Sequence, residues 1–273
     1  MCGEGKEGSG QMKEKSRQER ILALRDKLQR LKETDTELRI FGAAGQQSGH
    51  RYTFHPVFEE ELAQWETDCS LKLPEEYREY LKLAGYGTGP GYGLLSPAES
   101  RELYQQIYSS VSYYAECADT GGWFEERDFN KDTGYGRITY FHELKGKHVK
   151  RYKRLLETPL QENMSAGERD RYFMNIVPRV LSIEGGVVLT NHGHRYWDVL
   201  VVGGEMAGTV WQVDGCAGQS MRAQPDGFYE RGKLVLGAKQ ASGFLAYMER
   251  WADQALEECK SIYHNKTHGE IKP

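Results

Sequence analysis

The chain has no long apolar run. No window approaches the roughly eighteen consecutive apolar residues that a membrane-spanning helix requires. The start, Met1-Cys2-Gly3, is not followed by the apolar stretch of a secretory signal peptide. These absences predict a cytoplasmic protein with no membrane contact.

Cysteine is scarce and odd in number. The chain has 5 cysteines, and they are scattered: Cys2, Cys69, Cys117, Cys216 and Cys259. A disulfide framework needs an even set at regular spacings. We therefore expect reduced thiols.

Motifs of known catalytic chemistry are also missing. The chain has no Gly-x-Ser-x-Gly elbow and no Cys-to-His spacing of a known family signature. The glycine-rich run at 87–93 lacks a following Lys-Ser or Lys-Thr pair, and Pro90 removes an N–H, so we interpret it as a structural turn. His192 and His194 could face the same way on a strand as metal ligands, but a hairpin turn at this Asn-His-Gly-His stretch is favoured. We expect no enzyme activity, no metal and no cofactor.

What the chain does contain is enough apolar material for a core. It has 273 residues, of which 38% are hydrophobic, with 17 Tyr and 5 Trp and a mean hydropathy of −0.70. This length and composition predict one large domain with a hydrated surface.

Charge is distributed unevenly. Counting Lys and Arg against Asp and Glu, residues 1–34 carry +3, residues 35–145 carry −9, and residues 146–273 carry +2. An acidic middle repels nucleic acid and attracts basic proteins. Ordinary solvated helix faces explain the same distribution, so both interpretations stay open.

The N-terminal 34 residues divide into two parts. Residues 1–11 are rich in Gly, Glu, Lys and Ser, which predicts disorder. Ile21, Leu24, Leu28 and Leu31 then recur at three- and four-residue spacings, which predicts an amphipathic helical arm. Because the stripe is too short to be stable alone, it either docks on its own domain, which we favour, or pairs with another chain.

Two helices and a glycine turn follow. Phe58, Leu62 and Trp65 share one face of a helix that should end near Ser70. Leu73-Pro74-Glu75 begins a second helix, whose apolar stripe is Tyr77, Tyr80, Leu81 and Ala84. Gly85 suits its C-terminal cap.

The remainder indicates strands and a closing helix. We expect a helix over 99–118, helical segments near 145–156 and 163–173, and strands at 138–141, 180–183, 187–190, 197–202 and 208–213. A last helix over 239–260 should bury Phe244, Leu245, Met248, Trp251 and Leu256. This order predicts an α+β fold: a mostly antiparallel sheet flanked by helices, in a single domain with an N-terminal helical arm.

The order of these motifs resembles the SUKH superfamily, in its Smi/Knr-like branch of fungal cell-wall assembly regulators and bacterial immunity proteins. The resemblance runs from His50-Arg51-Tyr52 to Leu94, and resumes at 196–211 and 244–251. Its family-motif positions are Trp65, Glu66, Leu73, Pro74, Tyr77, Leu81, Gly87, Gly93, Trp197, Gly208, Trp211 and Trp251. It implies a domain over 35–260, followed by a tail at 261–273. Two features depart from the family and are not explained by it: the middle segment at about 101–174 is longer than such a domain needs, and the N-terminal arm precedes the domain.

The resemblance also implies a function. We expect a non-enzymatic protein-binding domain, in its most concrete form an immunity protein that covers the basic active site of a toxin, for example a nuclease. The contact candidates are the carboxylates of Glu75, Glu76, Glu79, Glu125, Glu126, Asp128 and Asp132. The alternative is a regulatory scaffold of the cell-wall regulator kind that recruits partners, or a second copy, through the N-terminal helix.

Overall fold

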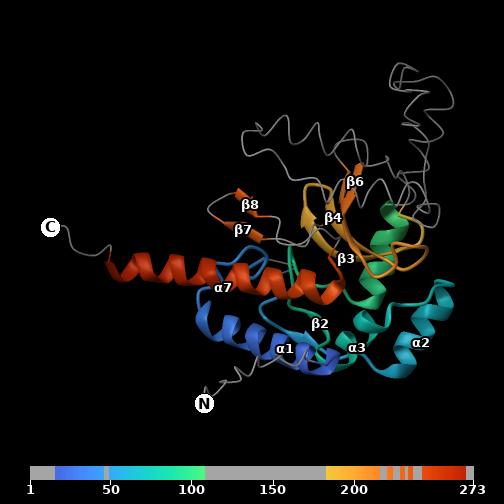
Figure 1. Cartoon of the computed structure of the whole chain (residues 1–273), viewed down its shortest axis with the longest axis horizontal. Helices are drawn as coiled ribbons and strands as arrows, with labels where there is room; N and C mark the ends of the chain where they lie inside the picture. Colours follow the sequence, from blue (N-terminus) through green and yellow to red (C-terminus); the bar gives the residue numbers. More distant parts are fainter. Residues whose placement is uncertain are drawn as a thin grey trace, which may run out of the picture.

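The computed structural model describes residues 16–45, 49–107, 183–215, 220–223, 228–230, 233–235 and 242–268. Helices α1 (Arg17–Thr34), α2 (Glu59–Asp68), α3 (Glu75–Leu83) and α7 (Phe244–His268) lie below the main sheet in Figure 1. A further helix begins at residue 97 and is described as far as residue 107. The expected segments at 138–141, 145–156 and 163–173 lie outside the described residues, as does most of 180–183.

The main sheet is antiparallel and has the order β3-β4-β5-β6, from β3 (Gly186–Gly193), β4 (Tyr196–Val201), β5 (Val210–Asp214) and β6 (Ser220–Ala223). The short pair β1 (Phe54–His55) and β2 (Tyr86–Gly87) joins it through Leu94, which bridges to both Gly87 and Thr190. β7 (Phe228–Glu230) and β8 (Lys233–Val235) form a separate pair. The predicted α+β fold with an antiparallel sheet is confirmed.

The two faces of the sheet are covered by different helices. Leu189, Leu200 and Val210 face the cluster that includes α3 and α7. The other face packs against the helix at 97–107 and contains both Trp197 and Trp211, which are 8% and 1% exposed. These two tryptophans are therefore core residues.

Helix α1 docks on its own chain. Ser16 and Glu19 form a capping box at its start. All four residues of the predicted stripe, Ile21, Leu24, Leu28 and Leu31, are at most 1% exposed. Ion pairs from Arg20 to Glu249 and from Lys27 to Asp253 tie α1 to α7, which lies alongside it in Figure 1. Helix α1 therefore docks on its own domain, which is the favoured alternative. The stripe is not available to a second copy while α1 stays in place.

The residue that precedes α2 differs from the prediction. Leu62 and Trp65 are buried, but Phe58 is 76% exposed. Phe58 is the N-cap of α2 and has extended backbone angles, so its side chain does not follow the helical periodicity that placed it on the buried face. Glu66 on α2 accepts from the Leu73 amide and pairs with Arg78, which fixes α2 against α3.

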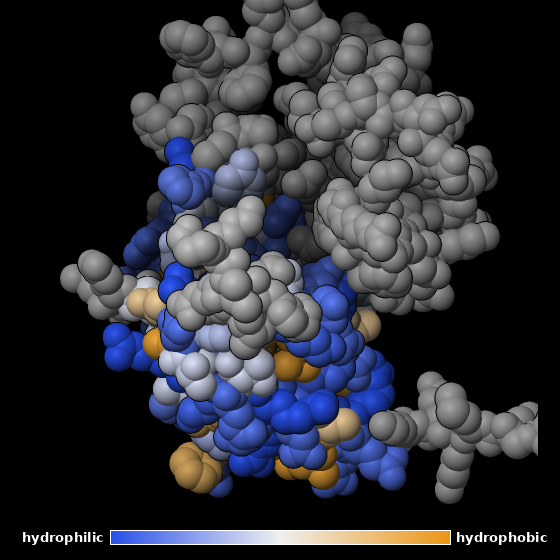
Figure 2. All heavy atoms as spheres, turned by 90° about the vertical axis from the view of Figure 1, so that its left-hand side faces the viewer, coloured by the Kyte–Doolittle hydropathy of each residue, from blue (hydrophilic) through white to orange (hydrophobic). Residues whose placement is uncertain are grey.

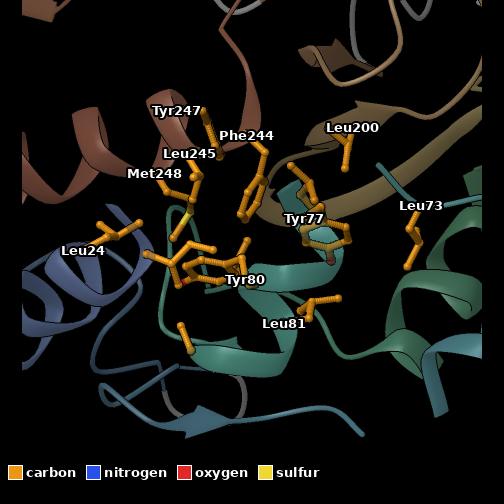
Figure 3. Packing of buried hydrophobic residues seen from close by; sticks show 14 of the residues in the cluster. Leu24, Leu73, Tyr77, Tyr80, Leu81, Leu200, Phe244, Leu245, Tyr247 and Met248 are labelled. Atoms are coloured by element: carbon orange, nitrogen blue, oxygen red, sulfur yellow. The ribbon is translucent and has the colours of Figure 1, made fainter. Parts of the chain in front are cut away.

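The core lies where α1, α3, α7 and the sheet meet (Figure 3). The ring of Phe244 lies edge-on to Tyr77 and Tyr80, with centroid distances of 4.7 and 5.0 Å. Such pairs add about 0.5 to 1.5 kcal/mol beyond the burial of their area. Phe244, Leu245 and Met248 are buried as expected, whereas Trp251 and Leu256 are only partly buried.

A fully buried carboxylate organises the loop after α1. Asp35 accepts hydrogen bonds from the amides of Arg39 and Ile40 and from the hydroxyls of Tyr52 and Tyr263, the last of these on α7. Burial acts to raise the pKa of Asp35, but these hydrogen bonds, led by that of Tyr52, lower it below its ordinary value. The charged carboxylate therefore joins α1, the loop and α7.

Replacing Asp35 with Asn should lower the unfolding free energy by about 2 to 3 kcal/mol, because at least one donor loses its acceptor. A depressed carboxyl pKa gives stability above the unfolded-state pKa that is lost as pH falls through the folded-state pKa. Denaturation from neutral to acidic pH should thus show a shallower loss in Asp35→Asn than in the wild type. Asp26→Asn, on the exposed side of α1, is the control and should change stability by less than about 0.5 kcal/mol.

Tyr77 and Tyr80 carry buried hydroxyls that have no hydrogen-bond partner within the described residues. Since an unpaired buried hydroxyl is costly, Tyr77→Phe and Tyr80→Phe should each raise the unfolding free energy by up to about 1 kcal/mol. Tyr52→Phe is the matched control, because its hydroxyl donates to Asp35 at 2.6 Å, and it should cost about 1.5 to 3 kcal/mol. A comparable loss in all three variants, measured by urea denaturation, would show that the two core hydroxyls are paired.

Candidate functional site

The three predicted contact carboxylates on α3 serve different roles. Arg17 of α1 pairs with Glu75 at 3.2 Å and with Glu79 at 3.1 Å, and these two carboxylates raise the pKa of Arg17. Glu75 remains 80% exposed and Glu79 34% exposed, so both can still face a partner. Their negative charge is partly neutralised by Arg17 of the same chain.

Glu76 has a structural role. Its Oε1 accepts from the Leu245 amide at 2.8 Å, at the first turn of α7. A carboxylate at this position satisfies an open N–H and interacts favourably with the helix dipole. This contact could not be predicted from sequence patterns, because the two residues are 169 positions apart. The other candidates, Glu125, Glu126, Asp128 and Asp132, lie outside the described residues.

The start of α2 carries the clearest exposed acidic surface. Glu59, Glu60 and Glu61 occupy its first turn, directly after the exposed ring of Phe58. Glu59 pairs with Lys82 and Arg78, which lower its pKa. Within the described part of the chain, neither Glu60 nor Glu61 forms an ion pair. We call Phe58, Glu60 and Glu61 the α2 acidic surface.

Aromatic exposure of this kind is uncommon in the described residues. The exposed large hydrophobic side chains there are Leu22, Phe41 and Phe58, and Phe58 is the most exposed of them. Figure 2 shows a face on which hydrophilic residues predominate and hydrophobic ones are separated from one another. Phe58 is therefore a candidate anchor for a partner, and three glutamates follow it directly in the chain.

A buried polar cluster lies between the sheet and α7. Asp198 is 1% exposed, and its Oδ2 is hydrogen-bonded to the Tyr247 hydroxyl and lies 2.6 Å from Nε2 of His192. Burial, followed by the charge of Asp198, raises the pKa of Tyr247. The cluster joins β3, β4 and α7, which favours a structural role.

The two histidines, His192 and His194, have different surroundings. His192 contacts Asp198, whereas His194 is exposed in the hairpin turn with φ 48°. Among the described residues, no group of three or more His, Cys, Asp or Glu side chains is arranged to hold a metal ion. In the same residues, no helix is long and apolar enough to cross a membrane.

The glycine turn is structural, as predicted. Its amides are used inside the chain: Gly87 donates to the Leu94 carbonyl and Tyr92 to the Asn191 carbonyl. Gly87 and Gly93 have φ of 108° and 106°, which explains why glycine is required there. These engaged amides offer little to a phosphate.

The motif residues of the resemblance are mainly structural here. Trp65, Leu73, Tyr77 and Leu81 belong to the core shared by the helices. Pro74 precedes α3 as its N-cap, Trp251 is partly buried on α7, and Gly208 has φ 86° before β5.

Glu76→Ala should lower the unfolding free energy by about 1 to 2 kcal/mol, because α7 loses the acceptor at its first turn. Glu75→Ala removes a neighbouring carboxylate whose pair with Arg17 is exposed, so it should change stability by less than about 0.5 kcal/mol. Thermal denaturation of both variants distinguishes the cap from the surface charge. Equal values for the two would argue against the capping role.

Comparison with known proteins finds no matching family model, no matching curated protein and no matching solved structure.

Proposed function

We propose that this chain is a non-enzymatic protein-binding domain that acts in the cytoplasm and neutralises a basic partner, as an immunity protein neutralises a toxin. The family resemblance in the motifs suggests this function. The α2 acidic surface is the observation that carries it, since an exposed phenylalanine there adjoins two carboxylates without ion pairs among the described residues.

The composition of this surface suits recognition of a basic protein. Interface energies are dominated by a few buried anchors, and large aromatic side chains are common among them. Burying the ring of Phe58, now 76% exposed, supplies such an anchor. Glu60 and Glu61 then face the basic groups around it, which speeds association and disfavours acidic competitors.

The carboxylates of α3 extend the contact. Glu75 and Glu79 stay solvent-accessible although they pair with Arg17, and a basic partner could compete for them. Glu76 does not belong to this contact, because its carboxylate is used at the start of α7. The proposed interface therefore comprises Phe58, Glu60 and Glu61, with Glu75 and Glu79 at its border.

The scaffold alternative relies on the apolar stripe of α1. Its four residues are buried against the rest of the chain, so recruitment through them would require α1 to undock and expose the core. No other observation in the described residues favours it.

The proposal is tested by isolating a partner from cell lysate and secreted fraction with the tagged chain, and then measuring its affinity. Phe58→Ser combined with Glu60→Lys and Glu61→Lys should weaken binding by more than about thirtyfold, since an anchor residue contributes at least about 2 kcal/mol. Protection of cells that express the partner as a toxin should fall in parallel.

The control is Asp26→Lys combined with Glu33→Lys, which makes the same change in charge on the exposed side of α1. It should leave affinity within about twofold of the wild type at physiological salt. If neither the triple α2 variant nor added salt weakened the affinity, the proposed interface would be wrong.

A further inference from the structure

Three loops contact one another next to the end of α1. They are the loop at 35–45, the glycine turn, and the tip of the β3–β4 hairpin at Gly193-His194-Arg195. Gly42 packs so closely on the Gly91 carbonyl that a side chain at residue 42 would clash with it. Gly91 in turn lies against Asn191, and the Tyr92 amide donates to the Asn191 carbonyl at 2.9 Å. The three loops therefore form one continuous surface.

Aromatic side chains are presented on this surface. Phe41 is 56% exposed, and its ring lies 5.5 Å from that of Tyr92. The Tyr92 hydroxyl lies over Gly193, where an added Cβ would be 3.1 Å away. Tyr92 is partly exposed, and no hydrogen bond of its hydroxyl is found within the described residues. The pair thus offers an apolar ring and a polar group side by side.

The hairpin tip adds positive charge. Arg195 is exposed and forms no ion pair within the described part of the chain, and the exposed His194 precedes it. The loop at 35–45 contains other charged side chains. Arg39 is paired with Glu37 at 2.9 Å, and Asp35 is buried. Among the described residues of these three loops, Arg195 therefore remains available to a partner.

The surface is held rigidly. The carboxylate of Asp35 fixes the Phe41 loop through the two preceding amides. His194 and Arg195 both have left-handed backbone angles, with φ of 48° and 66°, where Asn-Gly is the usual choice. Non-glycine residues in this conformation carry strain, and such strain gathers at functional sites. A preorganised surface loses less conformational entropy when it binds.

We propose that Phe41, Tyr92 and Arg195 form a second binding surface, which takes a short acidic peptide segment of a partner protein. Arg195 pairs with a carboxylate of the segment, and the two rings receive an apolar side chain next to it. A single-stranded nucleic acid would also find aromatic rings and a cation here. A peptide is favoured because a long polyanion would be repelled by a chain of net charge −4, which a short segment largely avoids.

The test uses the full chain and a short fluorescein-labelled peptide of glutamates with interspersed phenylalanines, followed by fluorescence anisotropy at low salt. Arg195→Gly should weaken binding about tenfold, the value expected for loss of one charge-assisted hydrogen bond. Since glycine suits the left-handed conformation at residue 195, this variant should fold at least as well as the wild type. Phe41→Ser should weaken binding by a similar factor without loss of stability, because its ring is exposed.

Lys72→Glu, an exposed cation between α2 and α3, is the control and should leave the affinity within about twofold. Three outcomes would overturn the proposal. They are no saturable binding of the peptide, equal weakening in the control, or tighter binding of an equally labelled oligothymidylate than of the peptide. Because none of these variants touches the α2 acidic surface, failure here leaves the proposed function untouched, and the reverse also holds.

Discussion

The contact of Phe244 with Tyr77 and Tyr80 is the interaction on which the rest of the structure depends. It brings the first turn of α7 onto α3, and the same approach places the Leu245 amide on Glu76. Once α7 lies there, it covers one face of the sheet and provides the apolar groove that α1 fills. The Asp35 network closes the other end of the α1–α7 pair. Apolar packing thus supplies most of the free energy of folding. The carboxylates of Asp35 and Glu76 fix how the helices are positioned against one another.

Sequence reasoning succeeded where periodicity dominates. The stripes of α1, α3 and α7, and the hairpin between β3 and β4, follow from apolar spacing and from glycine breaks, which are local properties. It was wrong at Phe58, because a residue at a helix cap does not obey the helical period. It did not predict β6, β7 or β8, nor the roles of Asp35 and Glu76. The sequence around a carboxylate does not indicate which distant amide will donate a hydrogen bond to it.

The same limit applies to the candidate surfaces. A count of charges identified the acidic middle of the chain, yet it could not separate Glu76, which is used within the fold, from Glu60 and Glu61, which are not paired in the described residues. The surface around Phe41 was invisible in sequence, because it is assembled from three loops that the glycines bring together. Both proposals therefore rest on tertiary placement, with the family resemblance giving only the class of function.

The pairing of α1 with α7 has a consequence for synthesis. Arg20 and its partner Glu249 are 229 residues apart, so the groove that buries the α1 stripe does not exist until almost all of this chain has been translated. At ordinary rates of elongation, the nascent chain carries four unburied aliphatic residues for about ten to fifty seconds. During that interval they are a natural target for ribosome-associated chaperones, and a stalled ribosome would leave them open to aggregation.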